Sequence, residues 1–263
     1  MIETKNTDPL LTYDLGPGVE AFSTRRNSVL PYPVLTAHQV HGTAIAVIRA
    51  SRDLPVHPER ADAGVRVFPP DVRRDDLQGF DALVTDIPGL AIGVRTADCV
   101  PILLHDPVRH VVAAVHSGWR GTVQRIVTKV IARMEIRYGT RPKDLRAVIG
   151  PAIGPDSFQV GEEVVQAFAA EPADVTEPAD ATEPAAFPMD EIWSLREPQP
   201  GKPMSGGHHI DLWRANRWLL EQAGIPASAI QVTGIDTYQS PEFFSARRET
   251  IACGRIINAI KLL

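Results

Sequence analysis

The sequence predicts an α+β fold with mixed layers, folded as a single domain over residues 1–263. Many short segments are rich in Val, Ile or Leu and are separated by turn signals, whereas only a few segments have the apolar spacing of an amphipathic helix. The two kinds of segment do not follow a regular βαβ alternation, so mixed sheets with a few long helices are expected. With 263 residues, 44% of them apolar, the chain is long enough to build a substantial core.

The strand candidates are short apolar runs bounded by turn residues. Their length suits strands better than helices, and Val and Ile favour the extended conformation. The candidates are residues 44–49, 81–85, 90–96, 100–104, 110–115, 145–149, 230–235 and 255–261.

The longest helix is predicted over residues 120–138. Apolar residues recur three and four positions apart from Val123 to Met134, which places them on one helical face. Gly139, followed closely by an Arg-Pro pair, is a typical helix end.

Two further helices are predicted in the second half of the chain. Residues 211–223 begin at the N-cap candidate Asp211 and end before Gly224. Residues 161–170 begin with two glutamates, which suit the positive end of the helix dipole.

An acidic repeat interrupts this pattern. The hexapeptides EPADVT, EPADAT and EPAAFP follow one another from residue 171, and residues 171–185 contain no Lys or Arg. Such a segment is too polar to bury, so residues 170–206 are expected to be an inserted, mobile loop without a role in the reaction. The alternative is a lid over a site.

Charge and composition exclude several classes of protein. The net charge is −5, which equals the charge of residues 171–185 alone, so the rest of the chain is neutral. A protein that wraps nucleic acid would be basic, so a small-molecule partner is expected and nucleic acid is not. No run of about 18 apolar residues predicts a membrane span, and the first ten residues lack the features of a signal peptide. With only two cysteines, Cys99 and Cys253, the reducing cytoplasm is the expected compartment. The protein is also expected to be a monomer.

Residues that can bind a metal or take part in a reaction are concentrated between positions 81 and 121. The apolar runs before and after Asp106-Pro107-Val108-Arg109 predict a hairpin with this turn. A turn centred there pairs Cys99 with His116, with Cβ atoms roughly 5 Å apart, close enough to share a metal ion. A bulge would slip the register by one residue.

Two neighbouring segments complete this candidate site. After His116 the chain passes through Gly118 into a helix, and the amides of a helix start favour anions and the thiolate form of Cys99. Upstream, His38 and His41 are three residues apart and point to opposite faces of an extended segment, so one of them is expected to face the site.

Taken together, these motifs resemble the laccase-domain family, whose members are described as polyphenol oxidase, purine nucleoside phosphorylase or peptidoglycan editing factor. The resemblance extends from about residue 36 to residue 261 and implies a layered α/β sandwich. It also implies metal ligands at His41, Cys99 and His116. The motifs are HQVHG, DALVTD, TADCVPILLHD, AAVHSGWRGT, IGPAIGPDSFQVGEEV, HIDLWRANRWLLEQAGI, DTYQSPEFFSARR and GRIINAI.

The chain also departs from the family's pattern. Family members often have Cys at the positions of Ala152 and Asp236, and they carry a longer stretch between the FSTRRNS and HQVHG segments. The acidic repeat is absent from the pattern. None of these departures touches the three ligand positions.

A ligand set of two His and one Cys leaves one position open on zinc, which is typical of catalytic sites, where the pKa of bound water falls to roughly 7. The same donors suit copper, but oxygen reduction by laccases needs several coppers. The resemblance therefore implies a zinc-dependent purine nucleoside phosphorylase acting on adenosine, inosine or methylthioadenosine with phosphate, with adenosine deaminase activity. The alternatives are a hydrolase that removes wrongly incorporated amino acids from a peptidoglycan precursor, a copper polyphenol oxidase, and a zinc-stabilised binding module without turnover.

Supporting roles are expected for several polar residues. Asp98 is predicted to orient a histidine ligand or to take a proton from bound water, with strand termination as the alternative, and Ser117 is a polar neighbour. Arg120, Arg247 and Arg248 are candidates for contacts with phosphate or carboxylate, with surface ion pairs as the alternative.

The remaining candidates are assigned structural roles. Cys253 and the Phe243-Phe244 pair are expected in the core, although a phenylalanine there can also stack on a base. The adjacent His208 and His209 are expected to support the start of the helix after residue 211.

Overall fold

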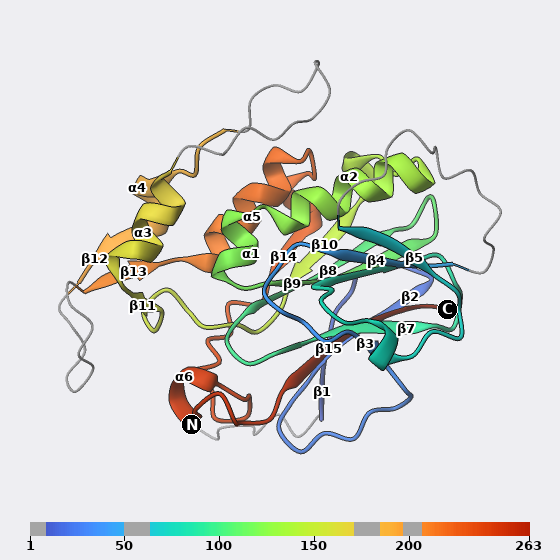
Figure 1. The fold of residues 1–263 in the computed structure, drawn as a ribbon, viewed down its shortest axis with the longest axis horizontal. Helices are drawn as coiled ribbons and strands as arrows, with labels where there is room; N and C mark the ends of the chain where they lie inside the picture. The colour runs from blue at the N-terminus through green and yellow to red at the C-terminus, as the bar shows by residue number, and fades with distance from the viewer. Residues whose placement is uncertain (1–8, 50–63, 171–184, 197–206) are drawn as a thin grey trace.

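The computed structural model describes residues 9–49, 64–170, 185–196 and 207–263. Within these residues two β-sheets lie face to face, and helices cover the outer face of the larger sheet (Figure 1). The fold class predicted from the sequence, mixed sheets and a few helices in one domain, is confirmed.

The larger sheet has seven strands in the order β14-β10-β8-β9-β6-β4-β5. Both of its faces are covered, so the central strands β8 and β9 are buried at every position and show no alternation of apolar and polar residues. The strands are β4 (Ile45–Ile48), β5 (Val65–Phe68), β6 (Ala82–Thr85), β8 (Val100–Asp106), β9 (Val111–Ser117), β10 (Arg146–Ile149) and β14 (Ile230–Val232).

The smaller sheet has five strands in the order β1-β2-β15-β7-β3. Its inner face meets the larger sheet in an apolar core where Ile92 and Ile260 pack with Leu83 and Leu103. The strands are β1 (Leu10–Thr12), β2 (Val19–Thr24), β3 (Leu35–Thr36), β7 (Ala91–Thr96) and β15 (Ile256–Leu262).

A second core lies between the larger sheet and the helices. Val127 and Ile131 of one helix and Leu219 of another pack on the face that includes Val115 of β9. This core is larger than the one between the sheets, and it explains the one-sided apolar pattern of the helices. The helices are α1 (Trp119–Val123), α2 (Ile126–Tyr138), α3 (Glu162–Ala169), α4 (Met189–Ile192), α5 (Leu212–Gln222) and α6 (Ala246–Glu249).

A small three-stranded sheet extends one end of the molecule, where α3 and α4 also lie (Figure 1). Its strand order is β11-β13-β12, and β13 contacts α3 while β12 contacts α4. Its strands are β11 (Gln159–Val160), β12 (Trp193–Leu195) and β13 (His208–Ile210).

The predicted helix over residues 120–138 is two helices in the structure. Arg125 adopts a left-handed conformation with φ of 58°, which ends α1 and starts α2. The helix end at Gly139 is confirmed, because this residue takes φ of 67° and its amide donates to the Glu135 carbonyl.

The other two helix predictions are confirmed. The Asp211 side chain caps α5 by accepting a hydrogen bond from the Arg214 amide at 2.9 Å. The third helix, α3, begins after Gly161 with two glutamates in its first turn.

The predicted hairpin exists, but its register differs from the prediction by two residues. Pro101, not Cys99, lies opposite His116. The Asp106 carboxylate accepts hydrogen bonds from the amides of Val108 and Arg109, so Asp106 still belongs to β8 and the turn comprises the next four residues. Because a shift of two residues preserves the face of each side chain, Cys99 stays on the face of His116.

Part of the predicted insertion is folded. Residues 171–184 and 197–206 lie outside the described residues, but the stretch between them forms α4 and β12. Phe187 and Ile192 are buried in the helix-side core. Their apolar side chains explain why a loop over the whole of 170–206 is too broad a prediction.

Every predicted strand has a counterpart, although β8 extends to Asp106 and β14 ends at Val232. The strands that the prediction missed are β1, β2, β3, β5, β11, β12 and β13, most of them two or three residues long. So short a segment shows too little alternation to be recognised in sequence.

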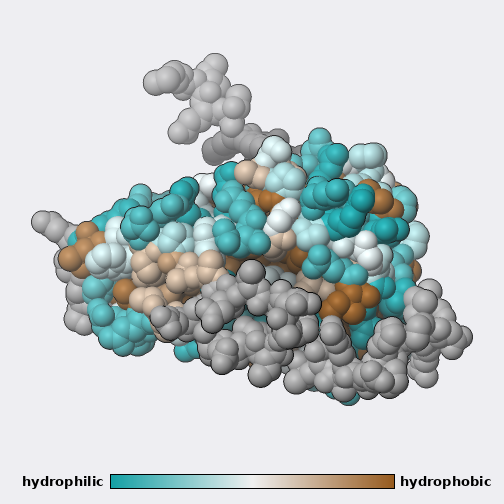
Figure 2. Space-filling model, turned by 90° about the horizontal axis from the view of Figure 1, so that it is seen from above, coloured by the Kyte–Doolittle hydropathy of each residue, from teal (hydrophilic) through white to brown (hydrophobic). Residues whose placement is uncertain are grey.

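No helix in the described ranges is long and apolar enough to cross a bilayer. Viewed from above Figure 1, the surface is mostly hydrophilic, and hydrophobic side chains form small, separate patches (Figure 2).

Candidate metal centre and its cleft

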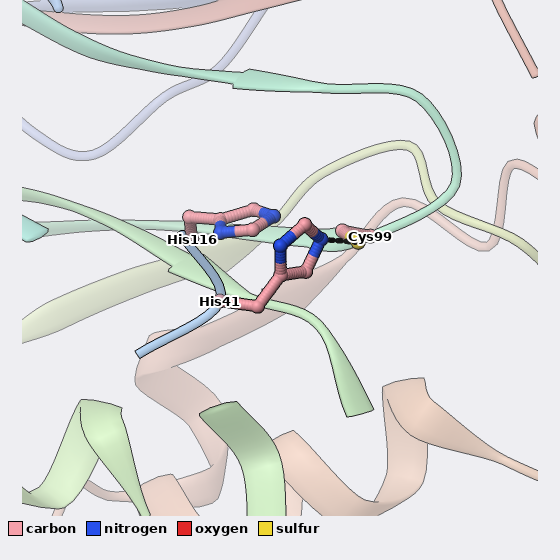
Figure 3. A group of neighbouring side chains, drawn as sticks. All are labelled: His41, Cys99 and His116. Atoms are coloured by element: carbon pink, nitrogen blue, oxygen red, sulfur yellow. Dashed lines mark hydrogen bonds between the residues drawn. The ribbon is translucent and has the colours of Figure 1, made fainter. Parts of the chain in front are cut away.

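Three potential ligands converge where the chain passes between the two sheets. His41 lies on the connection from β3 to β4 and Cys99 on the connection from β7 to β8, and both connections run from the smaller sheet to the larger one. His116 lies near the end of β9. The three side chains point toward one another in Figure 3.

The donor atoms are close enough to hold one ion. One nitrogen of each imidazole and the Cys99 sulfur all lie within 4.8 Å of one another. Cys99 Sγ is 3.8 Å from His41 Nε2, and the two imidazole rings meet edge to face at 4.8 Å between centroids. Ligands around tetrahedral zinc are about 3.5 Å apart, so a small contraction brings these atoms into range.

Asp81 holds the two histidine-bearing segments together. Its Oδ1 accepts a hydrogen bond from His116 Nδ1 at 2.8 Å and another from the His41 amide at 2.9 Å. Its Oδ2 accepts from the Gly42 amide at 2.8 Å and from the Val40 amide at 3.3 Å. With Nδ1 protonated and occupied, His116 presents Nε2 as its free donor atom.

Electrostatics favour the thiolate form of Cys99. Burial alone would raise the pKa of this thiol, but the charge of His116 and hydrogen bonds with His116 and His41 outweigh it and lower the pKa to about 6. Burial would lower the pKa of His116, yet the charge of Cys99 and the hydrogen bond to Asp81 raise it to about 9. Both shifts favour a thiolate–imidazolium pair when no metal is bound.

Backbone geometry leaves little free space around the donors. His41 adopts φ of 63°, a left-handed conformation that turns its ring toward the site. A Cβ placed on Gly118 would lie 2.9 Å from Cys99 Sγ and 3.3 Å from His41 Cδ2. Glycine is therefore required where the chain passes beneath the ligands.

This donor set fits a zinc ion. Two imidazoles and one thiolate are the ligands zinc prefers, and three protein ligands leave one position for water or substrate. The hydrogen bond from His116 to Asp81 is the support that metal-bound histidines usually have. Among the described residues, no other group of three or more His, Cys, Asp or Glu side chains converges in this way.

Asp98 lines the cleft, and its hydrogen bonds go to groups other than the two histidines. Its carboxylate accepts hydrogen bonds from Thr237 Oγ1 at 2.7 Å and from the Arg247 amide at 2.6 Å. It therefore anchors the start of α6 beside the site, because its left-handed conformation (φ of 87°) directs the side chain there. Asp81 has the role that was predicted for Asp98.

Ser117 and Arg120 lie outside the cleft. The Ser117 hydroxyl donates to Asn216 Oδ1 at 2.7 Å in a buried polar cluster beneath α1, because it follows His116 on β9 and points to the opposite face. Arg120 is exposed, and its guanidinium stacks on the Trp119 ring at 4.2 Å.

Of the two C-terminal arginines, only Arg247 lines the cleft. Its Nη1 donates to the Gln159 carbonyl at 3.0 Å. Arg248 donates to the carbonyls of Thr237 and Tyr238 at 2.7 and 2.8 Å, which ties the loop before α6 together. Arg248 is therefore a structural residue in this protein.

The ligands lie in an open cleft of about 1010 Å³. Trp119 and Phe158 contribute aromatic surface to it. Cys253, which was predicted to be in the core, also lines this cleft, because it belongs to the turn before β15 and not to the strand. Phe243 is fully buried, in agreement with the prediction.

The two adjacent histidines are structural, as predicted. His209 is buried and its Nδ1 bonds the Gly207 carbonyl at 2.9 Å. His208 pairs with Glu162 at 2.9 Å and accepts a hydrogen bond from Trp193 Nε1. Both lie in β13, directly before α5.

Sequence comparisons identify related proteins over most of the chain. A family model described as "Multi-copper polyphenol oxidoreductase laccase" matches residues 20–263. A protein of Bacteroides thetaiotaomicron named purine nucleoside phosphorylase is 42% identical over 191 residues, which are 72% of this chain and 63% of the relative. The match thus spans less than two thirds of that relative.

Two other relatives match over a larger share of their length. Adenosine deaminase RL5, from an unknown prokaryotic organism, is 39% identical over 223 residues, 84% of this chain and 72% of that protein. Purine nucleoside phosphorylase slr1573 of Synechocystis is 30% identical over 251 residues, 93% of this chain and 90% of that protein.

Solved structures share the fold along nearly the whole chain. The hypothetical protein YfiH of Bacillus licheniformis superposes with a TM-score of 0.72 at 26% identity and 98% coverage of both chains. YlmD of Geobacillus stearothermophilus superposes with a TM-score of 0.69 at 25% identity, covering 98% of this chain and 97% of that one.

Proposed function

This chain belongs to the multi-copper polyphenol oxidoreductase laccase family, and we propose that it is a zinc-dependent purine nucleoside phosphorylase that also deaminates adenosine. The observation that carries the proposal is the convergence of His41, Cys99 and His116 at one point in an open cleft. The names of relatives at 30–42% identity supply the reaction types.

Two reactions share one purine nucleoside substrate in this proposal. In phosphorolysis a phosphate oxygen forms a bond to C1′ of the ribose while the bond from C1′ to the purine nitrogen breaks, and the purine leaves with a proton. In deamination water adds at C6 of adenosine and ammonia leaves, giving inosine. Zinc bound at such a site polarises its ligands and lowers the pKa of water in the open position.

The chain's own residues position the ion and the substrate. Asp81 fixes the ring of His116 and the backbone at His41, so the donor atoms are preorganised. The cleft presents the rings of Trp119 and Phe158, which suit a purine base, and the guanidinium of Arg247, which suits an anion.

The number of candidate metal sites favours this reading over laccase chemistry. Reduction of oxygen to water takes four electrons and several coppers held by many histidines. Within the described parts of the chain only the one His-Cys-His group gathers three or more donors. A single ion suits hydrolytic and phosphorolytic chemistry.

The test is to incubate the zinc-loaded protein with adenosine, with and without phosphate, and to resolve the products by chromatography. We expect adenine and ribose 1-phosphate only with phosphate, and inosine in both mixtures. Cys99→Ser is the control, and it is expected to lose bound zinc and both activities. Adenosine recovered unchanged from the zinc-loaded protein, or turnover of phenols by the copper-loaded protein alone, would contradict the proposal.

Two subsidiary expectations accompany this function. The substrates are small molecules, so nucleic acid is not expected to bind. The three candidate metal ligands all come from one chain, so the protein is expected to act as a monomer. Size-exclusion chromatography with light scattering tests the second expectation.

A further inference from the structure

We propose that Arg74, Arg95 and Arg255 form the binding site for inorganic phosphate in this cleft. This inference rests on the proposed function, because phosphorolysis needs a phosphate co-substrate. The three residues belong to different elements, namely the short helical turn Arg74–Asp76, the strand β7 and the segment just before β15. None of them was singled out by the sequence analysis.

The cleft is basic although the protein as a whole is acidic. Its lining includes these three arginines and Arg247, whereas Asp98 is the only Asp or Glu that lines it among the residues the structure describes. The carboxylate of Asp98 is already engaged by Thr237 and by the Arg247 amide. In a chain with net charge −5, this concentration of positive charge selects an anionic ligand.

The three arginines are near one another and lack a counter-ion. Burial lowers the pKa of Arg95, and the charges of Arg74 and Arg255 lower it further, as expected for guanidinium groups crowded together. Within the described part of the chain, no carboxylate forms an ion pair with any of the three. A bound dianion would relieve this repulsion.

Local contacts hold the group in place before any ligand arrives. The Arg255 guanidinium donates to the carbonyls of Gly254 at 3.0 Å and Ile251 at 2.8 Å. Arg74 Nε is buried and has no hydrogen-bond partner among the described residues, so one donor remains unsatisfied in the free protein.

The arginine group is linked to the metal centre through Gln39. The Gln39 side chain accepts a hydrogen bond from the Arg95 amide at 2.8 Å and donates to the Arg95 carbonyl at 3.0 Å. Gln39 is two residues before the ligand His41, and Arg95 is four residues before the ligand Cys99. Phosphate held by the arginines therefore shares one cleft with a nucleoside at the metal centre.

Calorimetric titration of inorganic phosphate into the zinc-loaded protein tests the site directly. We expect Arg74→Gln and Arg95→Gln each to weaken phosphate binding by about tenfold, because each removes a charge-assisted hydrogen bond. The matched control is Arg66→Gln, since Arg66 is exposed on β5 and does not line the cleft. Arg255 is left intact because its side chain also supports the turn before β15.

Kinetics separate a phosphate site from a general effect on folding. In both variants KM for phosphate in phosphorolysis is expected to rise by about tenfold, whereas KM for adenosine and the rate of deamination, which uses no phosphate, stay within about twofold. Unchanged phosphate binding in both variants overturns the proposal. A loss of deamination as large as the loss of phosphorolysis also overturns it.

A parallel titration with adenosine 5′-monophosphate identifies the source of the phosphate group. Free phosphate is ruled out as the ligand if the wild type binds the nucleotide more tightly than phosphate and if the arginine variants lose this tighter binding. If the wild type shows no phosphorolysis, the proposed function fails, but phosphate binding that depends on Arg74 and Arg95 still supports the anion site.

Discussion

Asp81 is fully buried, and its carboxylate contacts the segments of both histidine ligands. It accepts hydrogen bonds from one imidazole and from three consecutive backbone amides. Burial opposes ionisation, but the hydrogen bond and charge of His116 together with the amides lower its pKa. This single side chain therefore fixes the orientation of one ligand and the backbone position of another.

We predict that Asp81→Asn lowers zinc affinity by roughly 10–100-fold. An amide keeps one acceptor oxygen, but its NH₂ group faces donor amides and it carries no charge to orient His116. Competition with a chromogenic chelator measures the change.

The control for this prediction is Asp106→Asn. Asp106 is an equally buried carboxylate that also accepts hydrogen bonds from two backbone amides, but it lies at the end of β8, before the turn to β9. The Asp106→Asn variant is expected to be less stable than the wild type and to keep its zinc affinity. Equal zinc affinity in the wild type and Asp81→Asn would show that the carboxylate does not support the site.

The two cysteines are predicted to react differently with iodoacetamide in metal-free protein. The pKa of the Cys99 thiol is lowered to about 6, whereas burial raises the pKa of Cys253. Because the thiolate is the reactive form, alkylation of Cys99 is expected to rise with pH around 6 and to precede that of Cys253 at pH about 7. Peptide mass spectrometry at several pH values measures the extent of alkylation at both cysteines.

Zinc is expected to protect Cys99 and to leave Cys253 unaffected. In the same way Cys253→Ser is expected to keep about one zinc per chain, whereas Cys99→Ser is expected to bind none. Preferential alkylation of Cys253 at neutral pH would mean that the thiols are assigned wrongly.

The convergence of His41, Cys99 and His116 was predictable from sequence, but the residues that surround them were not. His41, Cys99 and His116 lie in recognisable motifs, and so do Asp81, in DALVTD, and Asp98, in TADC. Only the folded backbone decides which of the two carboxylates turns toward His116. Arg74, Arg95 and Arg255 are likewise far apart in sequence and meet only in the cleft.

At the scale of elements, two local backbone features explain why the predicted helix and the predicted hairpin differ from the observed ones. Arg125 takes a left-handed conformation and divides one predicted helix into α1 and α2. The Asp106 side chain accepts a hydrogen bond from the Val108 amide in the following turn, and the observed hairpin register differs from the predicted one by two residues. Both depend on single residues whose conformation is not visible in an apolar pattern.

Gly118 connects β9 to α1 beneath the metal ligands, and we predict that Gly118→Ala impairs zinc binding without removing a donor. Its φ of −66° suits alanine, so no backbone strain is introduced. The added methyl group would meet Cys99 Sγ at 2.9 Å and would have to displace it. Zinc affinity is expected to fall by about tenfold, as small shifts of ligands typically cause.

Gly161→Ala is the matched control. Gly161 also precedes a helix in an extended conformation, with φ of −85°, and its new methyl group meets only the flexible side chain of Glu163. Zinc affinity is expected to be unchanged there. Identical zinc affinities of the two alanine variants would refute the steric argument.

At the scale of the whole molecule, the layers follow from the distribution of apolar residues. Strands that begin with long apolar runs and are buried at every position form the centre of the seven-stranded sheet, and helices with one apolar face form its outer layer. The sequence did not reveal the smaller sheet completely, because β1 and β3 have only three and two residues and β3 pairs with β7, which is distant in the chain. Pairing of this kind depends on the tertiary fold.

We predict that the acidic repeat is dispensable for the reaction. Replacing residues 171–185 with a short Gly/Ser linker is expected to leave zinc content and turnover within about threefold of the parent, because loop length itself costs little free energy. The folded residues that follow, which place Phe187 in the core, stay in this variant. Metal analysis and the adenosine assay check the result.

A lid would behave differently. Removal of a lid typically harms both turnover and apparent affinity. A loss of about a hundredfold in turnover with zinc still bound would therefore show that the segment closes over the substrate.

The position of His41 and Cys99 on the two connections between the sheets has a consequence for the order of folding. The two residues are 58 positions apart, and each reaches the site only after its own pair of flanking strands has joined different sheets. We therefore expect zinc to bind late in folding, to a nearly native chain, and not to act as a folding nucleus.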